Sequence, residues 1–492
     1  MTGTLADLLR ETATTRPELS LTVDDTARDL GTLAAAAEEV ASRLHSAGLQ
    51  PGARVVLLAP NGHEFLVSWM AAQLAGLETA VVNTSYPDEL LGEMFAVLRP
   101  EALLLSREHA GRQLSGPRLD ISDVVQGRLH ELGGALIPLG GAPAGHTRPA
   151  DSIAGFMHTS GTTGVPKFCA QSHRYYLSLG RFVSHLFGLT AEDSVFSPLP
   201  LFHVNPLGYG LMGALSGGAD FHTAERFSVT GYWPKVVRDG VTVLILHGAP
   251  ISLLNRHADA EGAAGHAVRA SFFGDQEFLA RFGVPRSVSA YGSTEAGGIT
   301  HTRWWRLGES CAEPEGQMRC AGVPRPGVEW RLQDGEILVR AAEHELLLSG
   351  YVTADGLVDP RDDDGWFHTG DLGRRTGDGE LVFIERASES VRVKGEYVPL
   401  EYLEGVVSAV LDVPIIAWKR VVDGEEQLVL YAEGPVDLAR YRAVEEDLPR
   451  FMRPAAFAEV AALPRDAGLG KVQRRRLSEV PVVRWSETSS AR

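Results

Sequence analysis

The sequence predicts an α/β protein with a large, multi-layer N-terminal domain, built on mostly parallel sheets, and a small α+β C-terminal domain. The chain has 492 residues, which is too many for one compact core. Apolar, strand-like runs alternate with amphipathic helical segments along the N-terminal part. This pattern changes near residue 388, and the remaining stretch of roughly 100 residues is long enough for a second domain. We therefore expect domains at 1–387 and 388–492.

The expected elements of the first domain begin with a largely helical region at 5–49, which a Pro-Gly pair ends. Apolar and amphipathic runs then alternate, as they do in α/β layers. Residues 111–149 are richer in Gly and Pro, which predicts a surface connection. We expect β segments at 54–58, 79–82, 195–199, 241–246, 288–290, 328–350 and 380–384, and helices at 64–77, 88–98 and 172–186.

The second domain is expected to combine short strands with two helices. The helices are predicted at 400–411 and 438–448 from their apolar spacing. The strands are predicted at 391–394, 413–418 and 427–432.

Composition excludes several classes of function. A hydrophobic content of 44% and a charged content of 22% are typical of a soluble globular protein. The net charge of -17 argues against a nucleic-acid partner, whose phosphates call for a basic face. Three cysteines without C-x-x-C spacing favour reduced thiols in a cytoplasmic protein over a zinc site or disulfides. Neither a signal peptide nor a membrane span is expected, since Glu78 interrupts the longest apolar stretch.

The stretch with the highest density of glycines and hydrogen-bond donors is 157–167, Met-His-Thr-Ser-Gly-Thr-Thr-Gly-Val-Pro-Lys. Its glycines let the backbone approach a ligand, and its N–H groups, hydroxyls and lysine are donors that suit a polyphosphate. An ordinary Gly/Thr/Ser loop is the alternative. A Walker-type nucleotide loop is disfavoured, because Phe168 rather than Ser or Thr follows Lys167 and the glycine spacing differs.

Lysine is scarce in this chain, and this makes its positions informative. Only five of the 46 basic residues are lysine. A lysine on a glycine-flanked loop therefore suggests a need for a compact ammonium group. Lys167, Lys394 and Lys471 lie on such loops.

Five motifs occur in order along nearly the whole chain: 157–167, Tyr291–Glu295, Thr369–Asp371, Arg386 and Gly470-Lys471. Together they resemble the acyl-adenylate-forming (AMP-binding) superfamily of acyl- and aryl-CoA ligases, peptide-synthetase adenylation domains and beetle luciferase. The resemblance implies that a carboxylic acid is joined to AMP with release of pyrophosphate and then passed to a thiol. It implies ATP and Mg²⁺ as cofactors, CoA as co-substrate and a mobile C-terminal domain.

The resemblance also implies how ATP is held. Tyr291 would lie against adenine beside Gly292, Thr294 would approach the α-phosphate, and Glu295 would help to hold Mg²⁺, a hard ion that favours oxygen ligands. Thr162 would take part in catalysis as well as in phosphate binding. The residues implied to wrap the β- and γ-phosphates are Thr159, Ser160, Gly161, Thr162, Thr163, Gly164 and Lys167.

Three further residues receive roles from the same resemblance. Asp371 would accept from the ribose hydroxyls, and Arg386 would make a second ribose contact. Lys471 would be catalytic, bridging the substrate carboxylate and the α-phosphate as a mobile point charge. The alternatives are a turn carboxylate for Asp371, a solvated surface arginine for Arg386 and a solvated loop lysine for Lys471.

Phe202 and His203 match an aromatic-His motif beside the acyl site of the family. We expect His203 to gate or orient the carboxylate, with a structural histidine as the alternative. Relatives that activate amino acids carry Asp after this Phe. His203 therefore indicates a small carboxylic acid without an α-amino group.

The acyl pocket is expected to involve Phe202, Phe272, Phe273, Gly274 and Ala290. Relatives often have a glycine-rich loop where this chain has Phe272 and Phe273, so the pocket is expected to be flat and apolar. The alternative is that these phenylalanines are core aromatics.

Two residues bear on the second half-reaction. Gly395 matches the glycine that lines the thiol tunnel and supports a pantetheine acceptor, with a plain turn glycine as the alternative. Ser388 replaces the Asp or Lys usual at the hinge, and this departure leaves another acceptor open: a carrier protein, an amine or a small inorganic nucleophile. A different class, a nucleotide-binding sensor without catalysis, is opposed by Lys471, Glu295 and Asp371.

Overall fold

The computed structural model describes residues 3–115, 118–120, 148–159, 166–309, 319–343, 346–386, 391–393, 396–398, 400–422, 425–446, 448, 450–465 and 472–488. The chain divides into two compact units. One comprises Met1–Ser310, Ala321–Arg331 and Leu338–His368, and the other Cys311–Cys320, Leu332–Ile337 and Thr369–Arg492. The predicted boundary between residues 387 and 388 lies outside the described residues and stays a prediction.

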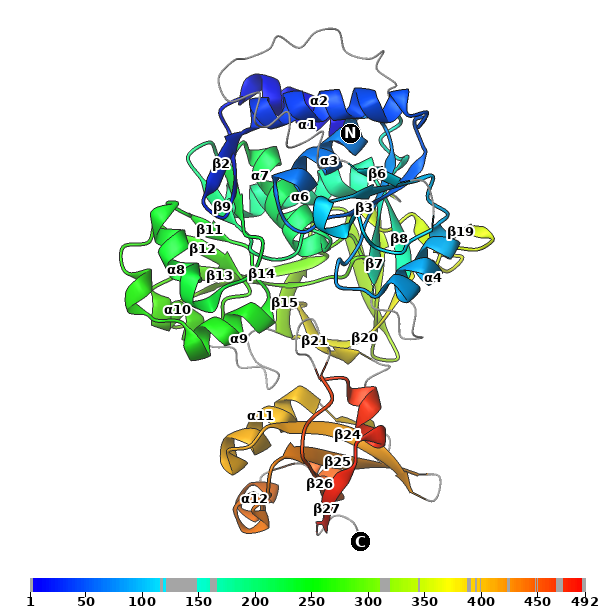
Figure 1. Cartoon of the computed structure of the whole chain (residues 1–492). Helices are drawn as coiled ribbons and strands as arrows, with labels where there is room; N and C mark the ends of the chain where they lie inside the picture. Colours follow the sequence, from blue (N-terminus) through cyan, green and yellow to red (C-terminus); the bar gives the residue numbers. More distant parts are fainter. Residues whose placement is uncertain are drawn as a thin grey trace. The chain divides into compact units, whose positions relative to one another are not determined.

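The larger unit is built on two sheets (Figure 1). In the first, β10, β9, β11, β12 and β13 lie in this order, and each is parallel to its neighbour. β1 extends it on one side and pairs with β2, while antiparallel β14 follows β13 on the other and pairs with β15. The bounds are β1 Ser20–Val23, β2 Thr26–Asp29, β9 Ser194–Phe196, β10 Asp220–Thr223, β11 Val243–Leu244, β12 Ala270–Phe272, β13 Arg286–Tyr291, β14 His301–Arg306 and β15 Cys320–Pro324.

The second sheet has the order β19-β18-β8-β7-β4-β3-β5-β6. Its strands from β7 to β6 are parallel. The near-continuous apolar runs of β3, β5 and β7 are typical of strands buried on both faces. The pairs β7–β8, β8–β18 and β18–β19 are antiparallel. The bounds are β3 Arg54–Leu58, β4 Glu78–Val81, β5 Ala102–Leu105, β6 Arg118–Asp120, β7 Ile153–Thr159, β8 Lys167–Ser172, β18 Gly350–Thr353 and β19 Gly356–Val358.

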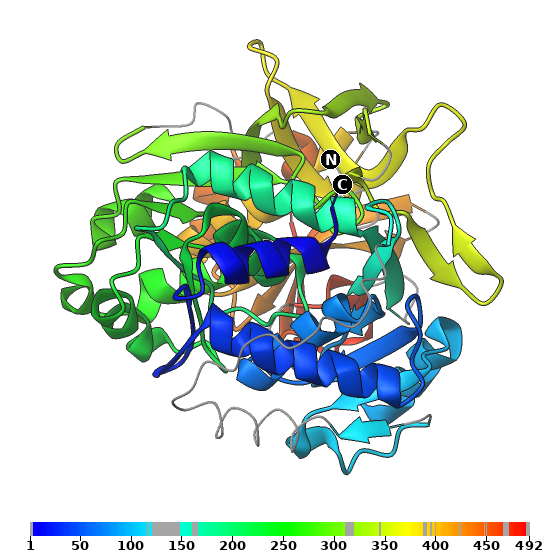
Figure 2. The ribbon, with the colours of Figure 1, turned by 90° about the horizontal axis from the view of Figure 1, so that it is seen from above.

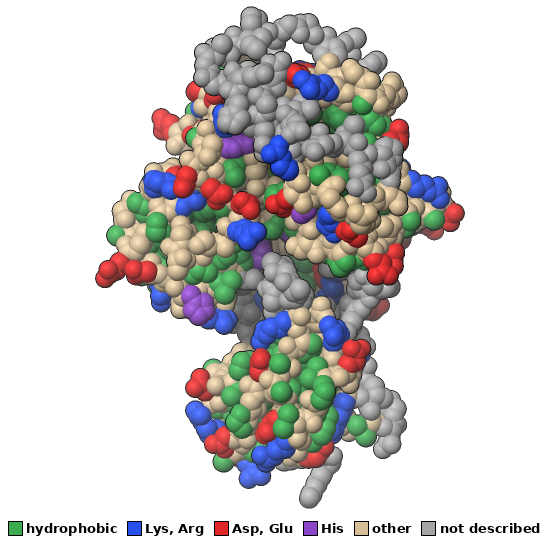
Figure 3. All heavy atoms as spheres, viewed as in Figure 1, with side chains coloured by type: hydrophobic (Ala, Val, Ile, Leu, Met, Phe, Trp, Pro, Cys, Tyr) green, Lys and Arg blue, Asp and Glu red, His purple; other side chains and the backbone are tan. Residues whose placement is uncertain are grey.

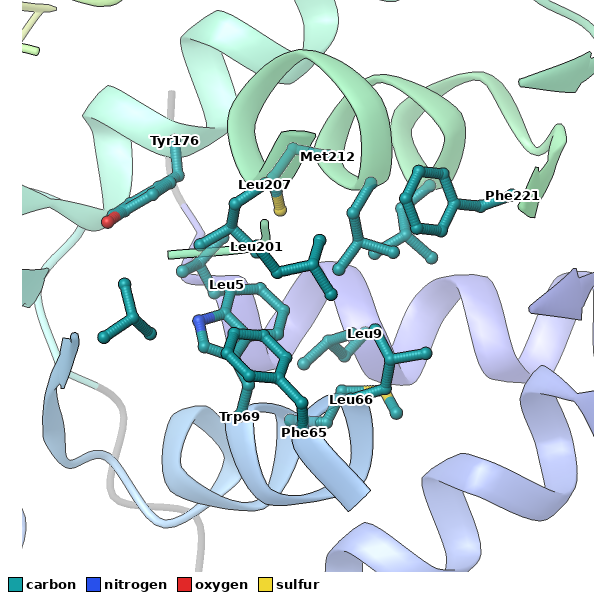
Figure 4. Close-up of a cluster of buried hydrophobic side chains, with 14 of the residues drawn as sticks. Leu5, Leu9, Phe65, Leu66, Trp69, Tyr176, Leu201, Leu207, Met212 and Phe221 are labelled. Carbon is teal, nitrogen blue, oxygen red and sulfur yellow. The ribbon is translucent and has the colours of Figure 1, made fainter. Parts of the chain in front are cut away.

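Helices α1, α3, α6 and α7 enclose an apolar core between these sheets. Leu5 and Leu9 of α1 face Phe65 and Trp69 of α3, and Figure 4 shows Met212 of α7 above them; each is at most 2% exposed. A capping box of Thr4 and Asp7 starts α1. The helices are α1 Leu5–Thr15, α2 Leu30–Ser46, α3 His63–Leu74, α4 Asp88–Leu98, η1 Arg107–His109, α6 His173–Phe187, η2 Asn205–Leu211, α7 Met212–Gly217, α8 Val229–Arg238, α9 Gly248–His257, η3 Glu261–Ala263 and α10 Gln276–Phe282.

The second unit has a core of its own around a four-stranded sheet of order β24-β25-β26-β27. It also contains the antiparallel pairs β20–β21 and β22–β23. Strands β16 and β17 each run across the boundary between the units. The bounds are β16 Val328–Gln333, β17 Glu336–Ala341, β20 Phe367–Arg375, β21 Leu381–Arg386, β22 Val391–Val393, β23 Glu396–Val398, α11 Leu400–Leu411, β24 Ile415–Val422, β25 Glu425–Glu433, α12 Leu438–Glu445, η7 Arg450–Met452, β26 Ala456–Val460, η8 Arg474–Glu479 and β27 Val482–Glu487.

The predicted fold class is confirmed, with one local correction. The expected helical region at 5–49 contains the hairpin β1–β2 between α1 and α2. Asp24 supplies the turn with a φ of 48°, a conformation that Asp tolerates better than most residues. Within the expected β segment 328–350, a turn lies at Asp334 and Gly335, which both have positive φ.

The surface seen in Figure 3 carries acidic and basic side chains interspersed over the larger unit. Viewed from above, helices α1 and α2 lie side by side at the N-terminal end of the chain (Figure 2). Within the described chain, no helix is long and apolar enough to cross a membrane.

Candidate active site

The predicted phosphate loop connects the two strands of a hairpin. Thr159 at the end of β7 pairs with Lys167 at the start of β8, so the two ends of the loop lie side by side. Lys167 is exposed. Of the loop residues between them, Ser160, Gly161, Thr162, Thr163 and Gly164 lie outside the described residues.

The segment that follows β13 is held against this hairpin. Leu348 donates its backbone N–H to the carbonyl of Glu295 at 2.9 Å, and Ser349 donates to the carbonyl of Ala170 on β8 at 2.8 Å. β18 then places Tyr351 opposite Cys169 on β8. Residues 348–351 thus connect the predicted adenine and magnesium segment to the predicted phosphate hairpin.

Tyr351 contacts both charged groups of this region, and sequence reasoning missed it. Its hydroxyl donates to Oε1 of Glu295 at 3.3 Å, while Nζ of Lys167 lies 5.3 Å from the centre of its ring. A carboxylate and an ammonium group therefore sit on one aromatic side chain, and the ring face attracts the cation. The only signal in the sequence was an aromatic residue in a strand, which does not indicate a role.

The backbone around Glu295 explains why its neighbours are small. A Cβ on Gly292 would lie 2.1 Å from the carbonyl oxygen of Gly298, so no other residue fits there. Tyr175 of α6 donates its hydroxyl to the carbonyl of Thr294 at 2.9 Å. Tyr291 is the last residue of β13, which is parallel to β12, and Gly292, Thr294 and Glu295 follow it. Ligands of α/β sheets bind at this end of such strands.

Glu295 is the predicted protein ligand of magnesium. In the part of the chain that the structure describes, no group of three or more His, Cys, Asp or Glu side chains surrounds a metal position. Mg²⁺ commonly takes one or two carboxylates together with substrate phosphates and waters. A single carboxylate beside a phosphate loop fits that requirement.

Phe202 and His203 lie in an aromatic cluster that includes His158, which sequence reasoning had not selected. The ring centres of Phe202 and His203 are 4.5 Å apart, and His158 stacks on Phe202 at 5.9 Å and lies 6.2 Å from His203. Tyr86 completes the cluster at 5.2 Å from His158. The cluster brings the predicted gate beside the residue that precedes Thr159 on β7.

His158 is held in one tautomer. The backbone N–H of Asn83 donates to its Nε2 at 3.2 Å, so the proton lies on Nδ1, which is 3.4 Å from the hydroxyl of Tyr86. Burial, with the nearby His203 as the smaller cause, lowers the pKa of His158 to about 3. His158 is therefore a neutral wall of the cluster rather than a proton carrier near pH 7.

The predicted acyl-pocket residues differ in their burial. Phe272 is fully buried and stacks on Tyr209 at 5.4 Å, whereas Phe273 is half-buried with a φ of 59°. A Cβ on Gly274 would lie 2.4 Å from Oγ of Ser271, so this position requires glycine. Ala290 is half-buried against the core.

Asp371 and Arg386 are direct partners in the second unit. They face each other across the β20–β21 pair, and Nε of Arg386 lies 2.8 Å from Oδ1 of the buried Asp371. Gly370 donates its N–H to Glu336 at 2.9 Å and Thr369 donates to the carbonyl of Ile337 at 2.7 Å, which fixes the turn before Asp371. The two predicted ribose contacts are thus presented together.

Three predicted residues, Lys471, Ser388 and Gly395, lie outside the described residues. The ends of the segment that contains Lys471 are nevertheless close, because Arg465 and Val472 form an antiparallel bridge and Gln473 donates to the carbonyl of Pro464 at 2.8 Å. The described residues on either side of Lys471, Arg465 and Val472, therefore lie side by side.

Comparison with known proteins finds a matching family and similar chains. Residues 9–358 match the family described as AMP-binding enzyme. The chain is 28% identical over 488 residues to a sulfoacetate–CoA ligase of Cupriavidus necator, with 91% of each chain covered. It is 30% identical over 481 residues to an oxalate–CoA ligase of Arabidopsis thaliana, covering 89% of this chain and 90% of the relative.

Solved structures show the same fold. An o-succinylbenzoate CoA synthetase of Bacillus subtilis with its acyl-adenylate intermediate has a TM-score of 0.81 at 22% identity, covering 98% of this chain and 99% of that one. The same enzyme with ATP and a magnesium ion has a TM-score of 0.79 at 21% identity, covering 97% and 100%.

Proposed function

We propose, for a chain that belongs to the family of AMP-binding enzymes, the ATP- and Mg²⁺-dependent activation of a carboxylic acid as its acyl- or aryl-AMP. Pyrophosphate leaves in this step, and the acyl group then passes to a thiol, for which CoA is the first choice. Two relatives that match most of the chain are named as CoA ligases, and this supports CoA as the acceptor.

The observation that carries the proposal is the arrangement of Lys167, Tyr351 and Glu295. A carboxylate is a poor electrophile, and adenylation supplies it with a good leaving group. The reaction brings two anions together, so positioning and electrostatic stabilisation dominate its barrier. Lys167, beside a donor-rich loop, would hold phosphates, and Glu295, on the same tyrosine, would hold Mg²⁺.

Mg²⁺ would supply charge neutralisation on the phosphates when bound. The residues of this chain do the remaining work in the proposal. Asp371 and Arg386 hold the ribose, Tyr291 covers adenine, and Lys471 bridges the acid carboxylate and the α-phosphate. Thr162 adds its hydroxyl to the phosphate loop.

His203 orients or gates the carboxylate in this proposal, with His158 and Phe202 fixing its surroundings. The acid is small and lacks an α-amino group, because His203 rather than an acidic residue stands directly after Phe202. Gly395 lines the path of the thiol, and Ser388 is the hinge. The scattered cysteines support a cytoplasmic location.

An acid panel tests this function. The purified full-length protein is supplied with ATP, Mg²⁺ and each acid, with and without CoA, and pyrophosphate and the acyl products are measured. We expect acid-dependent pyrophosphate release and a CoA thioester by mass spectrometry. Accumulated acyl-AMP without any thioester would favour a carrier protein, amine or inorganic acceptor, and ATP binding without turnover on any acid would favour a sensor.

A further inference from the structure

Arg325 is a buried arginine without a role in the reaction described so far. It directly follows β15, and only 3% of it is exposed. Among the residues that the structure describes, no hydrogen-bond partner exists for its Nε, Nη1 or Nη2. Burial lowers the pKa of this guanidinium to about 10, which still leaves it protonated at neutral pH. The unit therefore contains a buried cation whose donors are unused.

The surroundings of Arg325 are aromatic. Its Cζ lies 5.7 Å from the ring centre of Phe182 on α6. Tyr175 and Tyr209 are close enough to influence its pKa, but each donates its hydroxyl to a backbone carbonyl of residues 294–298. Neither tyrosine hydrogen-bonds to the guanidinium.

A pair of glycines lies beside the guanidinium. Gly297 and Gly298 both have a φ of 75°. A Cβ on Gly297 would lie 3.0 Å from Nη2 of Arg325, and one on Gly298 would lie 3.2 Å from the ring of Tyr209. The backbone of Gly297 therefore packs directly against the guanidinium, and no side chain of the described residues stands between them.

Arg325 lies next to the predicted acyl pocket. The ring of Tyr209, which neighbours Arg325, stacks on Phe272 at 5.4 Å, and Phe272 lies 5.3 Å from Phe273. One aromatic side chain, Tyr209, therefore lies between the guanidinium and Phe272, and Phe273 lies on from Phe272.

An unpaired buried charge is costly, and groups of this kind concentrate at sites that use the charge. The planar fork of a guanidinium offers paired donors that match a carboxylate or a similar oxyanion. A ligand with such a group would accept hydrogen bonds from Arg325, and the buried charge would then contribute to affinity and selectivity.

We propose that Arg325 recognises a second anionic group of the acid, at the end of the acyl pocket away from the carboxylate that is activated. The preferred substrates are then short acids that carry a carboxylate or sulfonate at the far end. This inference rests on the proposed function, since it concerns the substrate of the same site.

Matched acids test it. Malonate, succinate, glutarate and 3-sulfopropionate are each compared with the monocarboxylate of equal carbon number in pyrophosphate release. We expect at least a 10-fold higher kcat/KM for the best dianion in the wild type. Arg325→Leu is expected to remove that preference mainly through KM, while Arg325→Lys keeps part of it. Arg226→Leu, the same change at a fully solvated arginine, is expected to retain the wild-type preference.

A binding measurement keeps the test independent of turnover. The melting temperature is followed against each acid without ATP, in the wild type and in the Arg325→Leu and Arg325→Met variants. We expect a dianion-dependent rise in the wild type alone. Circular dichroism verifies that the variants fold, and removal of the unpaired charge is expected to raise their melting temperature without ligand.

The two hypotheses fail differently. Absence of pyrophosphate release with every acid contradicts the proposed function. The melting temperatures with and without each acid still test whether Arg325 binds a second anionic group. Equal preference for monoanions and dianions, or a preference that persists in Arg325→Leu, contradicts the second-anion site even in an active enzyme. Equal melting shifts in the wild type and the variants do the same.

Discussion

At the scale of single residues, Tyr351 joins two charged groups that the sequence motifs place far apart in the chain. Lys167 lies against its ring and Glu295 accepts from its hydroxyl. The sequence motifs predicted both charged residues, because Lys167 and Glu295 each lie on or beside a glycine-containing segment. Tyr351 carries no such signal, and only the pairing of β18 with β8 brings it to the site.

Glu295→Gln is expected to lower kcat/KM for acid-dependent pyrophosphate release by about 100-fold, because the carboxylate that would hold Mg²⁺ loses its charge. A higher Mg²⁺ requirement should accompany this loss. Glu343→Gln, a control at the exposed partner of Arg174, should retain activity within about twofold. Wild-type rates and Mg²⁺ dependence in Glu295→Gln would contradict the assignment.

His158 predicts how stability depends on pH. Its pKa is about 3 in the fold and about 6.5 in the unfolded chain, so the unfolded state binds the proton first. The stability that neutral His158 contributes is complete above pH 6.5 and falls, by about 1.4 kcal/mol per unit, as the pH drops toward 3. His173, whose pKa burial lowers to about 4, acts in the same direction.

Denaturant unfolding at several values between pH 7.5 and 4.5 measures this effect. Between pH 7.5 and 4.5, His158→Gln should lose less unfolding free energy than the wild type, because one histidine no longer takes up a proton on unfolding. Adding His173→Gln should reduce the loss further. Identical pH slopes in the wild type and the double variant would show that these imidazoles are not the groups responsible.

At the scale of elements, the loop before Phe202 and His203 depends on one buried asparagine. Nδ2 of Asn61 donates to the carbonyls of Leu199 at 2.8 Å and Ala224 at 2.9 Å, and its Oδ1 accepts from the N–H of Leu201 at 2.8 Å. In the sequence, Asn61 lies between a predicted strand at 54–58 and a predicted helix at 64–77, with no sign of these contacts. The partners of Asn61 are more than a hundred residues away, and local patterns do not reveal them.

Asn61→Ala is expected to destabilise the protein by about 1–3 kcal/mol and to raise KM for the acid, because buried backbone groups lose their partners and the approach to His203 loosens. Denaturant melts and pyrophosphate-release kinetics measure the two effects. Thr4→Ala, which removes the cap of α1, is a matched control expected to cost about 1 kcal/mol without changing KM. Equal KM values in both variants would mean that Asn61 only stabilises.

Secondary structure was predictable where the apolar periodicity is strong. It was less predictable where a turn between short elements determines the local structure. The buried parallel strands and helices such as α3 and α6 follow from apolar runs of suitable length. The hairpin β1–β2 was missed, because its short strands lie between two Ala- and Leu-rich helices and its turn is an Asp pair without glycine. The π-helical segment η2 was also not expected, since Pro206 and two glycines are weak helix formers.

At the scale of the whole molecule, the order of five motifs along the chain predicted both the fold class and the family, which the match over residues 9–358 confirms. The motifs are local and contiguous, so sequence alone identifies them. His158, Tyr351, Asn61 and Arg325 act through contacts that only the assembled sheets create. The acid itself depends on such contacts, and for this reason the motifs leave it open.

Acid-dependent pyrophosphate release by Lys471→Ala tests the central claim most directly. We expect release by the wild type with at least one acid and a loss of about 100-fold or more in Lys471→Ala, because the bridging charge is removed. Lys419→Ala, a control at another of the five lysines, should behave as the wild type. Release by Lys471→Ala at the wild-type rate, or no release by the wild type with any acid, would contradict the account.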